Sequence, residues 1–372
     1  MIAAVYFLPV IACLVLHLAF GYNGDRTTYM WILLAGEATV AAAHKLAYSR
    51  RTNSTEYLGS LVTGIFYEEP WTELTTHIET RTDRNGRTYT VRKIRHHHHS
   101  EIFYFTTTTG KTFNTGEQFF CDVRDQWQLP RHSDRWTGCN IRGGVRYGCH
   151  YSIGDMTPEQ FDTPKYWIPI TETNSYKNKI RCSNSIFKFE KISSEQAKAI
   201  GLFDYPDIYG YDAPCILPGE FELPFSVDSM FRRFNARYAP EVQMRLYILL
   251  FPADKGIAIS EMQRAYWQGG NKNELVVCIG LTAESDIAWA RAFSWADEQT
   301  VEADIAQWLM KHRRLDWQEF HNWLTTRIAD WRRKEFADFD YINVTLPLSS
   351  FLLILALSIL ENALAIYLAV KP

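Results

Sequence analysis

Apolar residues gather at both ends of the chain. Residues 2–21 form a run without a charged side chain, and about 20 residues cross the roughly 30 Å hydrocarbon core of a bilayer. A signal peptide is the alternative, but the basic segment that opens one is missing. A second run covers 29–47, and a third covers 348–370 after Pro347. The pattern predicts a transmembrane helical hairpin at 1–48 and a C-terminal transmembrane helix at 344–372.

The next part of the chain has a β pattern, with alternating or continuous β-branched and aromatic residues. Asn85-Gly86 favours a tight hairpin turn, and a second hairpin is expected across 109–111. Many glycines between 126 and 164 predict long loops. The predicted strands are 57–67, 71–81, 88–94, 102–107, 112–120 and 185–191. These strands predict a β-rich soluble domain at 49–202.

The pattern changes again after a proline-rich segment, 203–224, which we interpret as a linker or draped loop. Beyond it, helical and strand periods follow one another. The predicted helices are 227–238, 259–267, 300–312 and 316–336, and the predicted strands are 242–251, 275–281 and 287–295. An α/β sandwich domain is therefore expected at 225–343. The fold class predicted for the whole chain is α+β, an integral membrane protein with three transmembrane helices flanking the two soluble domains.

Part of this α/β domain resembles a known family. The apolar strand 245–251 and the segment 266–277, Tyr-Trp-Gln-Gly-Gly-Asn-Lys-Asn-Glu-Leu-Val-Val, resemble the TPM-type α/β domain. The resemblance covers about a third of the chain and implies an α/β sandwich, and TPM-type domains commonly face outside the cytoplasm. The overall layout resembles uncharacterised membrane-anchored proteins of bacteria and phages, which implies no catalytic residue.

Composition and charge limit the function classes. The chain has 372 residues, of which 47% are hydrophobic and 22% charged, with a formal net charge of -3. This balance excludes charge-driven disorder and a strongly basic nucleic-acid binder, so no nucleic-acid partner is expected. Basic residues near the span ends favour a cytoplasmic soluble region in a multi-pass cell-membrane protein. Lys45, Arg50, Arg51, Arg332, Arg333 and Lys334 lie on the soluble side, against Arg26 and Lys371 on the other.

Cysteine and histidine residues suggest one candidate metal site. Zinc takes Cys and His in tetrahedral sets, so Cys139, Cys149, His150 and one more ligand are candidates. Their spacing matches no common zinc pattern, and the run His96–His99 would alternate faces on a strand. A Cys139–Cys149 disulfide is the alternative if the topology is inverted. A cytoplasmic location predicts free thiols instead. The six cysteines outside the predicted spans are Cys121, Cys139, Cys149, Cys182, Cys215 and Cys278.

Acidic and glycine-rich segments offer weaker candidates. Asp204, Asp207 and Asp212 share a loop, and Asp338 and Asp340 would share a face of an extended strand. No His, Lys or nucleophile accompanies them at a telling spacing, so a solvated face is the preferred interpretation. The segment 269–272 precedes a strand rather than a helix, which favours a tight turn over a phosphate loop. No cofactor is expected.

The predicted spans contain four polar residues that would be costly against lipid: His17, Glu37, Glu361 and Asn362. An ionisable group at a helix centre costs about 2.5–3.5 kcal/mol. We therefore expect these side chains to face other helices, and small residues around Glu37 allow close helix packing. Mutual hydrogen bonding in a bundle or an oligomer is the preferred interpretation, and a proton or ion path is the alternative.

Three functions follow as hypotheses. The first is a non-enzymatic, membrane-tethered binding or assembly module, whose partners are the lipid bilayer and either further copies of the chain or another membrane protein. Its 12 Trp and 20 Tyr residues support this, because such residues anchor interfaces. The second is an oligomeric channel or transport component that uses Glu37 and Glu361. The third is a metal-dependent hydrolase.

Overall fold

The computed structural model divides into two compact units. One unit comprises Met1–Glu56, Ser175–Lys191 and Lys334–Pro372, and the other comprises Tyr57–Asn174 and Ile192–Arg333. The described residues are 5–20, 26–68, 70–129, 136–142, 145–180, 189–295, 300–342 and 344–370. The predicted strand at 185–191 therefore lies mostly outside the described residues.

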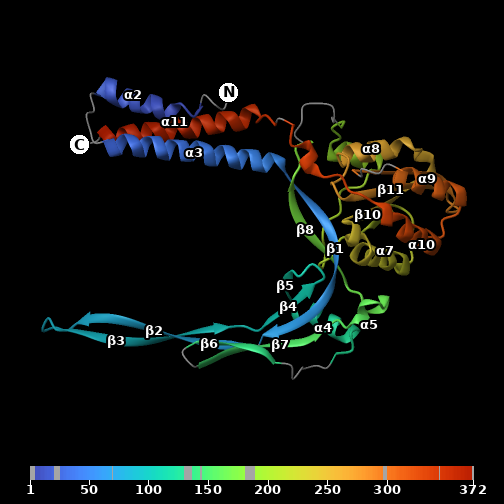
Figure 1. Ribbon diagram of the computed structural model, residues 1–372, viewed down its shortest axis with the longest axis horizontal. Helices are drawn as coiled ribbons and strands as arrows, with labels where there is room; N and C mark the ends of the chain where they lie inside the picture. The colour runs from blue at the N-terminus through green and yellow to red at the C-terminus, as the bar shows by residue number, and fades with distance from the viewer. Residues whose placement is uncertain are drawn as a thin grey trace. The chain divides into compact units, whose positions relative to one another are not determined.

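Three helices make up most of the first unit (Figure 1). They are α2 (Leu8–Phe20), α3 (Arg26–Thr52) and α11 (Leu348–Val370). Two buried clusters hold them together, and each draws residues from all three segments of the chain. One cluster contains Val5, Val40 and Ile354, and the other contains Ala12, Leu16 and Ile32 with Ala365 beside them. This order places α3 antiparallel to both α2 and α11.

The second unit contains a six-stranded sheet in the order β5-β4-β1-β7-β6, with β8 also paired to β1. Its elements, including short helices, are β1 (Asn53–Glu68), β4 (Ile102–Thr107), β5 (Thr112–Thr115), α4 (Glu117–Gln126), β6 (Trp136–Arg142), β7 (Val145–Asp155), α5 (Pro158–Phe161) and β8 (Pro169–Lys177). Val62, Ile65 and Phe105 on the sheet pack against Phe120 and Val123 on α4.

Two predictions for this region are wrong. Residues 126–164 are not long loops, because β6 and β7 form an antiparallel pair there. The strand predicted at 112–120 ends at Thr115, and α4 begins at Glu117. Phe120 and Val123 lie three apart and are both buried, which is a helical spacing rather than a strand spacing.

A separate two-stranded ribbon consists of β2 (Trp71–Thr82) and β3 (Thr88–His99). The strands pair without interruption from Trp71 opposite His99 to Thr82 opposite Thr88. At the turn, Oδ1 of Asp83 accepts hydrogen bonds from the backbone amides of Asn85 and Arg87. Gly86 has a φ of 77°, which glycine adopts without strain. The predicted hairpin is confirmed, but residues 84–86 lie between the paired Asp83 and Arg87, so the expected two-residue turn is wrong. The return strand extends five residues beyond Ile94.

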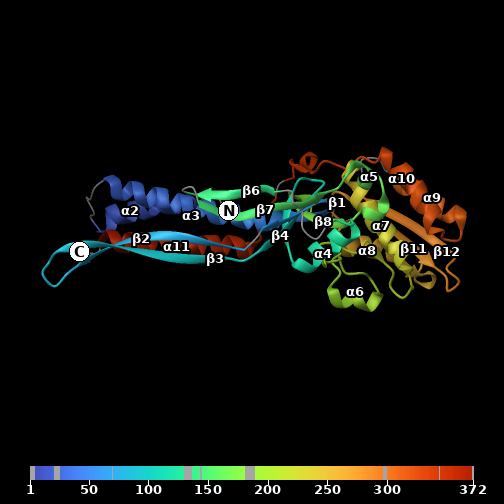
Figure 2. The same cartoon turned by 90° about the horizontal axis from the view of Figure 1, so that it is seen from below.

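The α/β part of the second unit contains a four-stranded sheet in the order β12-β11-β10-β9. Figure 2 labels two of its strands, β11 and β12. β10 is parallel to β9 and β11, and β12 is antiparallel to β11. The strands are β9 (Ile216–Leu217), β10 (Arg245–Pro252), β11 (Glu274–Leu281) and β12 (Ile287–Ser294). The helices are α6 (Ser194–Ile200), α7 (Phe225–Arg237), α8 (Ala258–Tyr266), α9 (Thr300–His312) and α10 (Trp317–Arg327).

Helices cover both faces of this sheet, which explains why β11 is buried at every position. One face packs against α7, α9 and α10, and the other against α6 and α8. The segment predicted as a linker, 203–224, contributes β9 to the sheet. Its Ala213, Cys215 and Ile216 are almost fully buried.

The chain beyond α9 differs from expectation in two places. The last helix ends at Arg327 rather than Phe336, and a 3-10 turn leads to Trp331, whose backbone is extended. Asp338 and Asp340 do not share a face of a strand, because residues 336–339 form another 3-10 turn. The predicted mixed α+β fold is confirmed, and its four-stranded sheet has helices on both faces.

Candidate functional site

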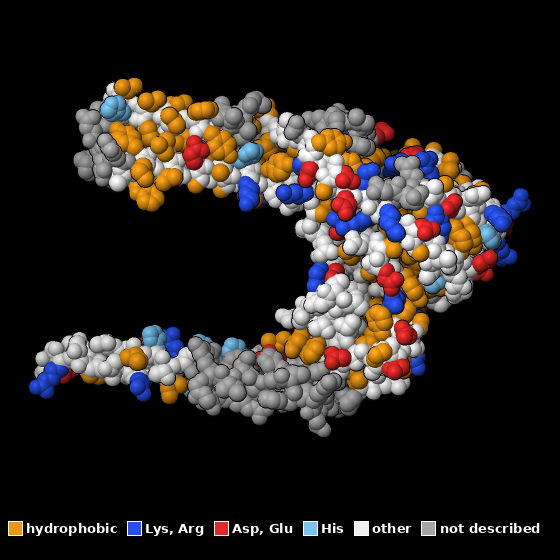
Figure 3. Space-filling view, in the orientation of Figure 1, with side chains coloured by type: hydrophobic (Ala, Val, Ile, Leu, Met, Phe, Trp, Pro, Cys, Tyr) orange, Lys and Arg blue, Asp and Glu red, His pale blue; other side chains and the backbone are white. Residues whose placement is uncertain are grey.

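The helix bundle has an apolar outer surface. Leu18, Trp31 and Leu360 expose 76%, 70% and 67% of their surface, although each is large and hydrophobic. Figure 3 shows such side chains spread along the bundle. Among the described residues, α11 is the one helix long and apolar enough to cross a membrane, and α2 contains a shorter apolar stretch, Leu8–Ala19. The three predicted transmembrane helices therefore stay a prediction.

The bundle interior contains polar groups. Asn362 is buried, and its Nδ2 donates a 2.7 Å hydrogen bond to the carbonyl of Ser358 one turn earlier. A Cβ on Gly36 would lie 2.5 Å from Cγ of Pro9, so glycine allows this close approach of α3 and the chain at α2. The bundle therefore combines an apolar exterior with an interior that holds both apolar clusters and polar groups.

The four predicted intramembrane residues differ in their surroundings. Asn362 faces the interior, and Glu361 forms a hydrogen bond with Thr39 of α3, while its Oε2 has no partner among the described residues. Glu37 is half-buried. His17 is exposed on α2, so a single chain does not cover it as expected.

The zinc candidates lie on β6 and β7, where Cys139 is directly opposite Cys149 and His150 follows. Their side chains lie outside the described part of the structure. Within the described side chains, no group of three or more His, Cys, Asp or Glu is arranged to hold a metal ion. The metal site and the alternative disulfide both stay predictions.

Three of the six soluble-region cysteines are described, and all three are free thiols. Cys121 is half-buried, whereas Cys215 and Cys278 are fully buried. Burial raises the pKa of the Cys215 thiol to about 12 and also raises that of Cys278, which makes both inert as nucleophiles.

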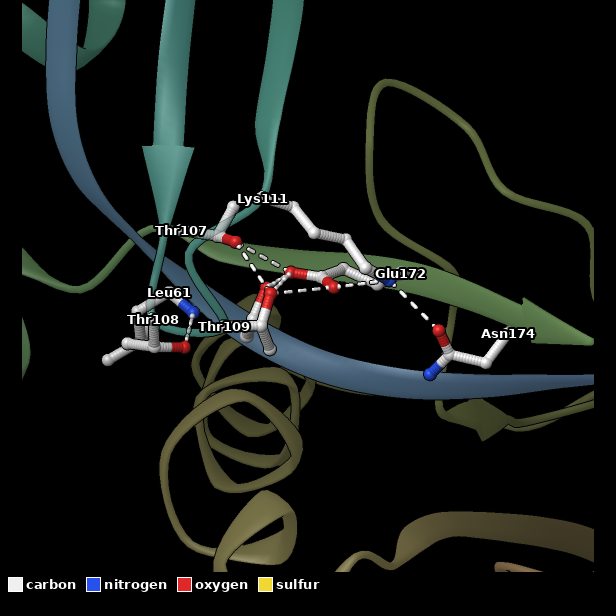
Figure 4. Close-up of polar contacts among 8 residues, drawn as sticks. Leu61, Thr107, Thr108, Thr109, Lys111, Glu172 and Asn174 are labelled. Carbon is white, nitrogen blue, oxygen red and sulfur yellow. Dashed lines mark hydrogen bonds and ion pairs between the residues drawn. The ribbon is translucent and has the colours of Figure 1, made fainter.

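A buried carboxylate on β8, Glu172, contacts β1, β4 and the turn between β4 and β5 (Figure 4). Its Oε1 accepts hydrogen bonds from the hydroxyls of Ser60 at 2.6 Å, Thr107 at 2.7 Å and Thr109 at 2.7 Å. Its Oε2 lies 2.9 Å from Nζ of Lys111. Burial alone would raise the pKa of Glu172, but these hydrogen bonds outweigh it and hold the pKa below its ordinary value.

A second buried carboxylate, Glu274, begins β11. It accepts hydrogen bonds from the hydroxyl of Tyr205 and from both the backbone and side-chain amides of Asn271. Burial raises the pKa of Glu274, and these hydrogen bonds oppose the shift. Burial and the nearby Glu274 charge raise the pKa of Tyr205 well above its ordinary value. Tyr205 and Asn271 therefore fix the position of the Glu274 carboxylate.

Arg245 lies directly opposite Glu274 at the start of β10 and is also buried. Its guanidinium donates to the hydroxyl of Thr171 at 2.9 Å and to the carbonyl of Ala213 at 2.7 Å. Thr171 also donates to Asp212. These contacts join β8 of the six-stranded sheet to the four-stranded sheet, both within the second unit.

The acidic loop does not form a cluster. Asp204 accepts a hydrogen bond from the hydroxyl of Tyr266, whereas Asp212 is buried against Thr171 and the amide of Ala213. The solvated-face interpretation is therefore wrong for Asp212. Segment 269–272 belongs to the tight turn that was predicted, with a φ of 84° at Gly269 and 79° at Gly270.

Comparisons with known proteins add no family. No protein-family model matches the chain, and no curated protein or solved structure is significantly similar to it. The resemblance of 225–343 to a TPM-type domain therefore stays a prediction.

Sequence reasoning missed the buried carboxylates Glu172 and Glu274. Glu274 carries a usable signal, because it directly precedes an apolar strand just as Arg245 precedes another. Glu172 lies in the polar stretch Thr171–Asn174, and nothing local distinguishes it from an exposed acid.

Proposed function

We propose that the chain is a non-enzymatic, membrane-tethered binding or assembly module whose three helices lie in the bilayer. The apolar exterior of the bundle carries this proposal, because exposed Leu, Ile and Trp along three adjacent helices are unfavourable in water and favourable in lipid. The buried polar residues Ser358 and Asn362 suit the same setting, since helices in membranes associate through small and polar side chains.

The soluble region supports binding rather than catalysis. Two of its buried carboxylates, Glu172 and Glu274, accept hydrogen bonds from neighbouring side chains. The aromatic residues support binding less than their number suggests, because many belong to the core. The buried tryptophans in the described regions are Trp127, Trp167, Trp267, Trp289 and Trp331. The basic residues beside the spans place this region in the cytoplasm in our proposal.

One pair of substitutions tests the membrane setting. Leu360 lies near the middle of α11 and Leu348 at its first residue, and both are more than 60% exposed. In lipid, Leu360→Lys costs about 2.5–3.5 kcal/mol, whereas Lys at position 348 extends its amine to the interface. We expect Leu360→Lys to lower the fraction of protein that resists carbonate extraction and Leu348→Lys to leave it unchanged. Equal fractions for both variants, or release of the wild type, would contradict the proposal.

A channel is the second candidate, and one observation favours it. Oε2 of Glu361 and Oδ1 of Asn362 are buried without a hydrogen-bond partner among the described residues. Such groups can line a path for ions or accept donors from another copy. Ion flux in liposomes separates these outcomes, because only a path makes Glu361→Gln change the flux while the oligomer size stays the same.

A further inference from the structure

The β2–β3 ribbon is long and largely exposed, and among the described elements outside the ribbon β2 contacts β7. Each strand has 12 residues, which at about 3.4 Å per residue gives a length of about 40 Å. Every residue of β3 is exposed except Val91, which is half-buried. Two-stranded ribbons with little further packing are marginally stable, so packing against another surface would stabilise this ribbon.

The two faces of the ribbon differ in character. Directly opposite residues of an antiparallel pair point to the same side. One face therefore carries the threonine pairs of positions 80 with 90 and 82 with 88, together with Ile78 and Ile94. The two isoleucines expose 57% and 63% of their surface. Arg92 also lies on this face, opposite Ile78. The other face carries Glu79, Arg81, Lys93 and Arg95, together with Tyr89 and Val91. The ribbon is thus amphipathic, with its less polar face uncovered.

The ribbon is also basic. Residues 71–99 contain six Lys and Arg against three Asp and Glu, a balance of +3 in a chain whose net charge is -3. Glu79 pairs with Arg81 and Lys93, and Asp83 is used by the turn. Among the described side chains, no acid pairs with the four other arginines, and Figure 3 shows cationic side chains at the end of the ribbon. The four other arginines are Arg84, Arg87, Arg92 and Arg95.

We propose that this ribbon lies on the anionic lipid headgroups of the membrane that holds the helix bundle, with Ile78 and Ile94 turned toward the headgroup region. The proposal rests on the membrane anchoring proposed above. Each Lys or Arg close to an anionic surface strengthens binding about fivefold, and the tether keeps the ribbon near that surface. Arg92 lies on the same face as the two isoleucines, and Arg84 and Arg87 lie at the turn, so these cationic side chains and the uncovered isoleucines can meet the same headgroup layer.

A second copy of the chain fits this face less well. A face about 40 Å long and two strands wide offers roughly 400 Å² per copy. The total of about 800 Å² lies below the roughly 1,200 Å² of stable interfaces. Two ribbons would also bring like charges together. An anionic lipid surface attracts the positive charges, and it does not require the interface area of a stable dimer.

Hydrogen exchange of the full chain in bilayer nanodiscs tests the proposal. Discs of phosphatidylcholine alone are compared with discs containing about a third phosphatidylglycerol. We expect amide exchange over residues 72–98 to slow at least tenfold in the anionic discs, and 0.5 M NaCl to reverse the slowing by screening. Equal exchange in both discs would overturn the proposal. Failure of the chain to enter discs would instead contradict the anchoring.

Two double variants with the same change in charge separate the ribbon from the rest of the protein. Arg87→Gln with Arg92→Gln removes about two fivefold contributions, so binding weakens about 25-fold and the slowing is lost. Lys198→Gln with Lys311→Gln changes two exposed positions outside the ribbon and should leave the slowing of exchange intact. Slowing that appears only with two copies per disc, or that a DNA oligonucleotide produces in neutral discs, would assign the ribbon to another partner and refute the proposal.

Discussion

Replacement of Glu172 offers a stability test whose size follows from the contacts. Glu172→Ala leaves the hydroxyls of Ser60 and Thr107 without their acceptor, and both residues are at most 3% exposed. Each buried, unsatisfied hydroxyl costs about 1–3 kcal/mol. Two such hydroxyls should lower the free energy of unfolding by about 2–6 kcal/mol.

Glu172→Gln should lower the free energy of unfolding less than Glu172→Ala does. Its carbonyl can still accept the hydroxyl hydrogen bonds, but these no longer go to a charged oxygen, and the pair with Lys111 is lost. The side chain of Lys111 is 42% exposed, so the pair itself contributes little. We expect a decrease of about 1–3 kcal/mol. Urea unfolding in detergent, followed by tryptophan fluorescence, measures both values.

An exposed glutamate supplies the control. Glu220→Ala should change the free energy of unfolding by less than about 0.5 kcal/mol. If Glu172→Ala had an effect as small as Glu220→Ala, the network would not contribute to stability and the reasoning would be wrong.

The same carboxylate predicts a pH dependence. The pKa of folded Glu172 lies below its ordinary value, so the unfolded chain takes up the proton first as the pH falls. The stabilisation is complete well above the unfolded pKa of about 4.3 and is lost as the pH falls through the folded pKa. The stability difference between wild type and Glu172→Gln should therefore narrow below about pH 4.5, and a constant difference down to pH 2 would contradict the assignment.

Three further outcomes are expected. A reporter fused at Ser193 should behave as cytoplasmic, and periplasmic alkaline phosphatase activity there would reverse the topology. Cys278 should react with a maleimide only after unfolding, whereas Cys121 should react in the folded protein, as timed labelling with mass spectrometry can show. Leu at Glu37 or Glu361 should weaken assembly by roughly 0.6–2 kcal/mol, whereas Gln should preserve it. Sedimentation in detergent measures this, and unchanged assembly in the Leu variants would mean that the glutamates are not interhelical.

Elements with a strong local period were predictable. The helix predicted at 300–312 matches α9 at both ends, because its buried residues Val301, Ile305 and Leu309 repeat at helical spacing. The strands β10 and β11 were predictable for a related reason, since a strand covered on both faces is apolar at nearly every position.

Elements that depend on pairing with distant parts of the chain were not predictable from the sequence. β6 and β7 run through a glycine-rich segment that has the composition of a loop. Gly138 lies at an irregularity in the register, where the strand accommodates an extra residue. Whether such a segment forms strands depends on the neighbour with which it pairs. β7 pairs with β1, which lies more than 80 residues earlier in the chain.

The sequence by itself determined the apolar ends, the mixed α+β class and the excess positive charge of the ribbon, because each follows from the composition or period of one continuous segment. Only the tertiary structure decided which acids are buried. Glu172 and Asp212 look like surface residues in the sequence, and they are enclosed because donors from distant strands converge on them. A carboxylate's environment depends on its neighbours in space, and a local pattern contains no information about them.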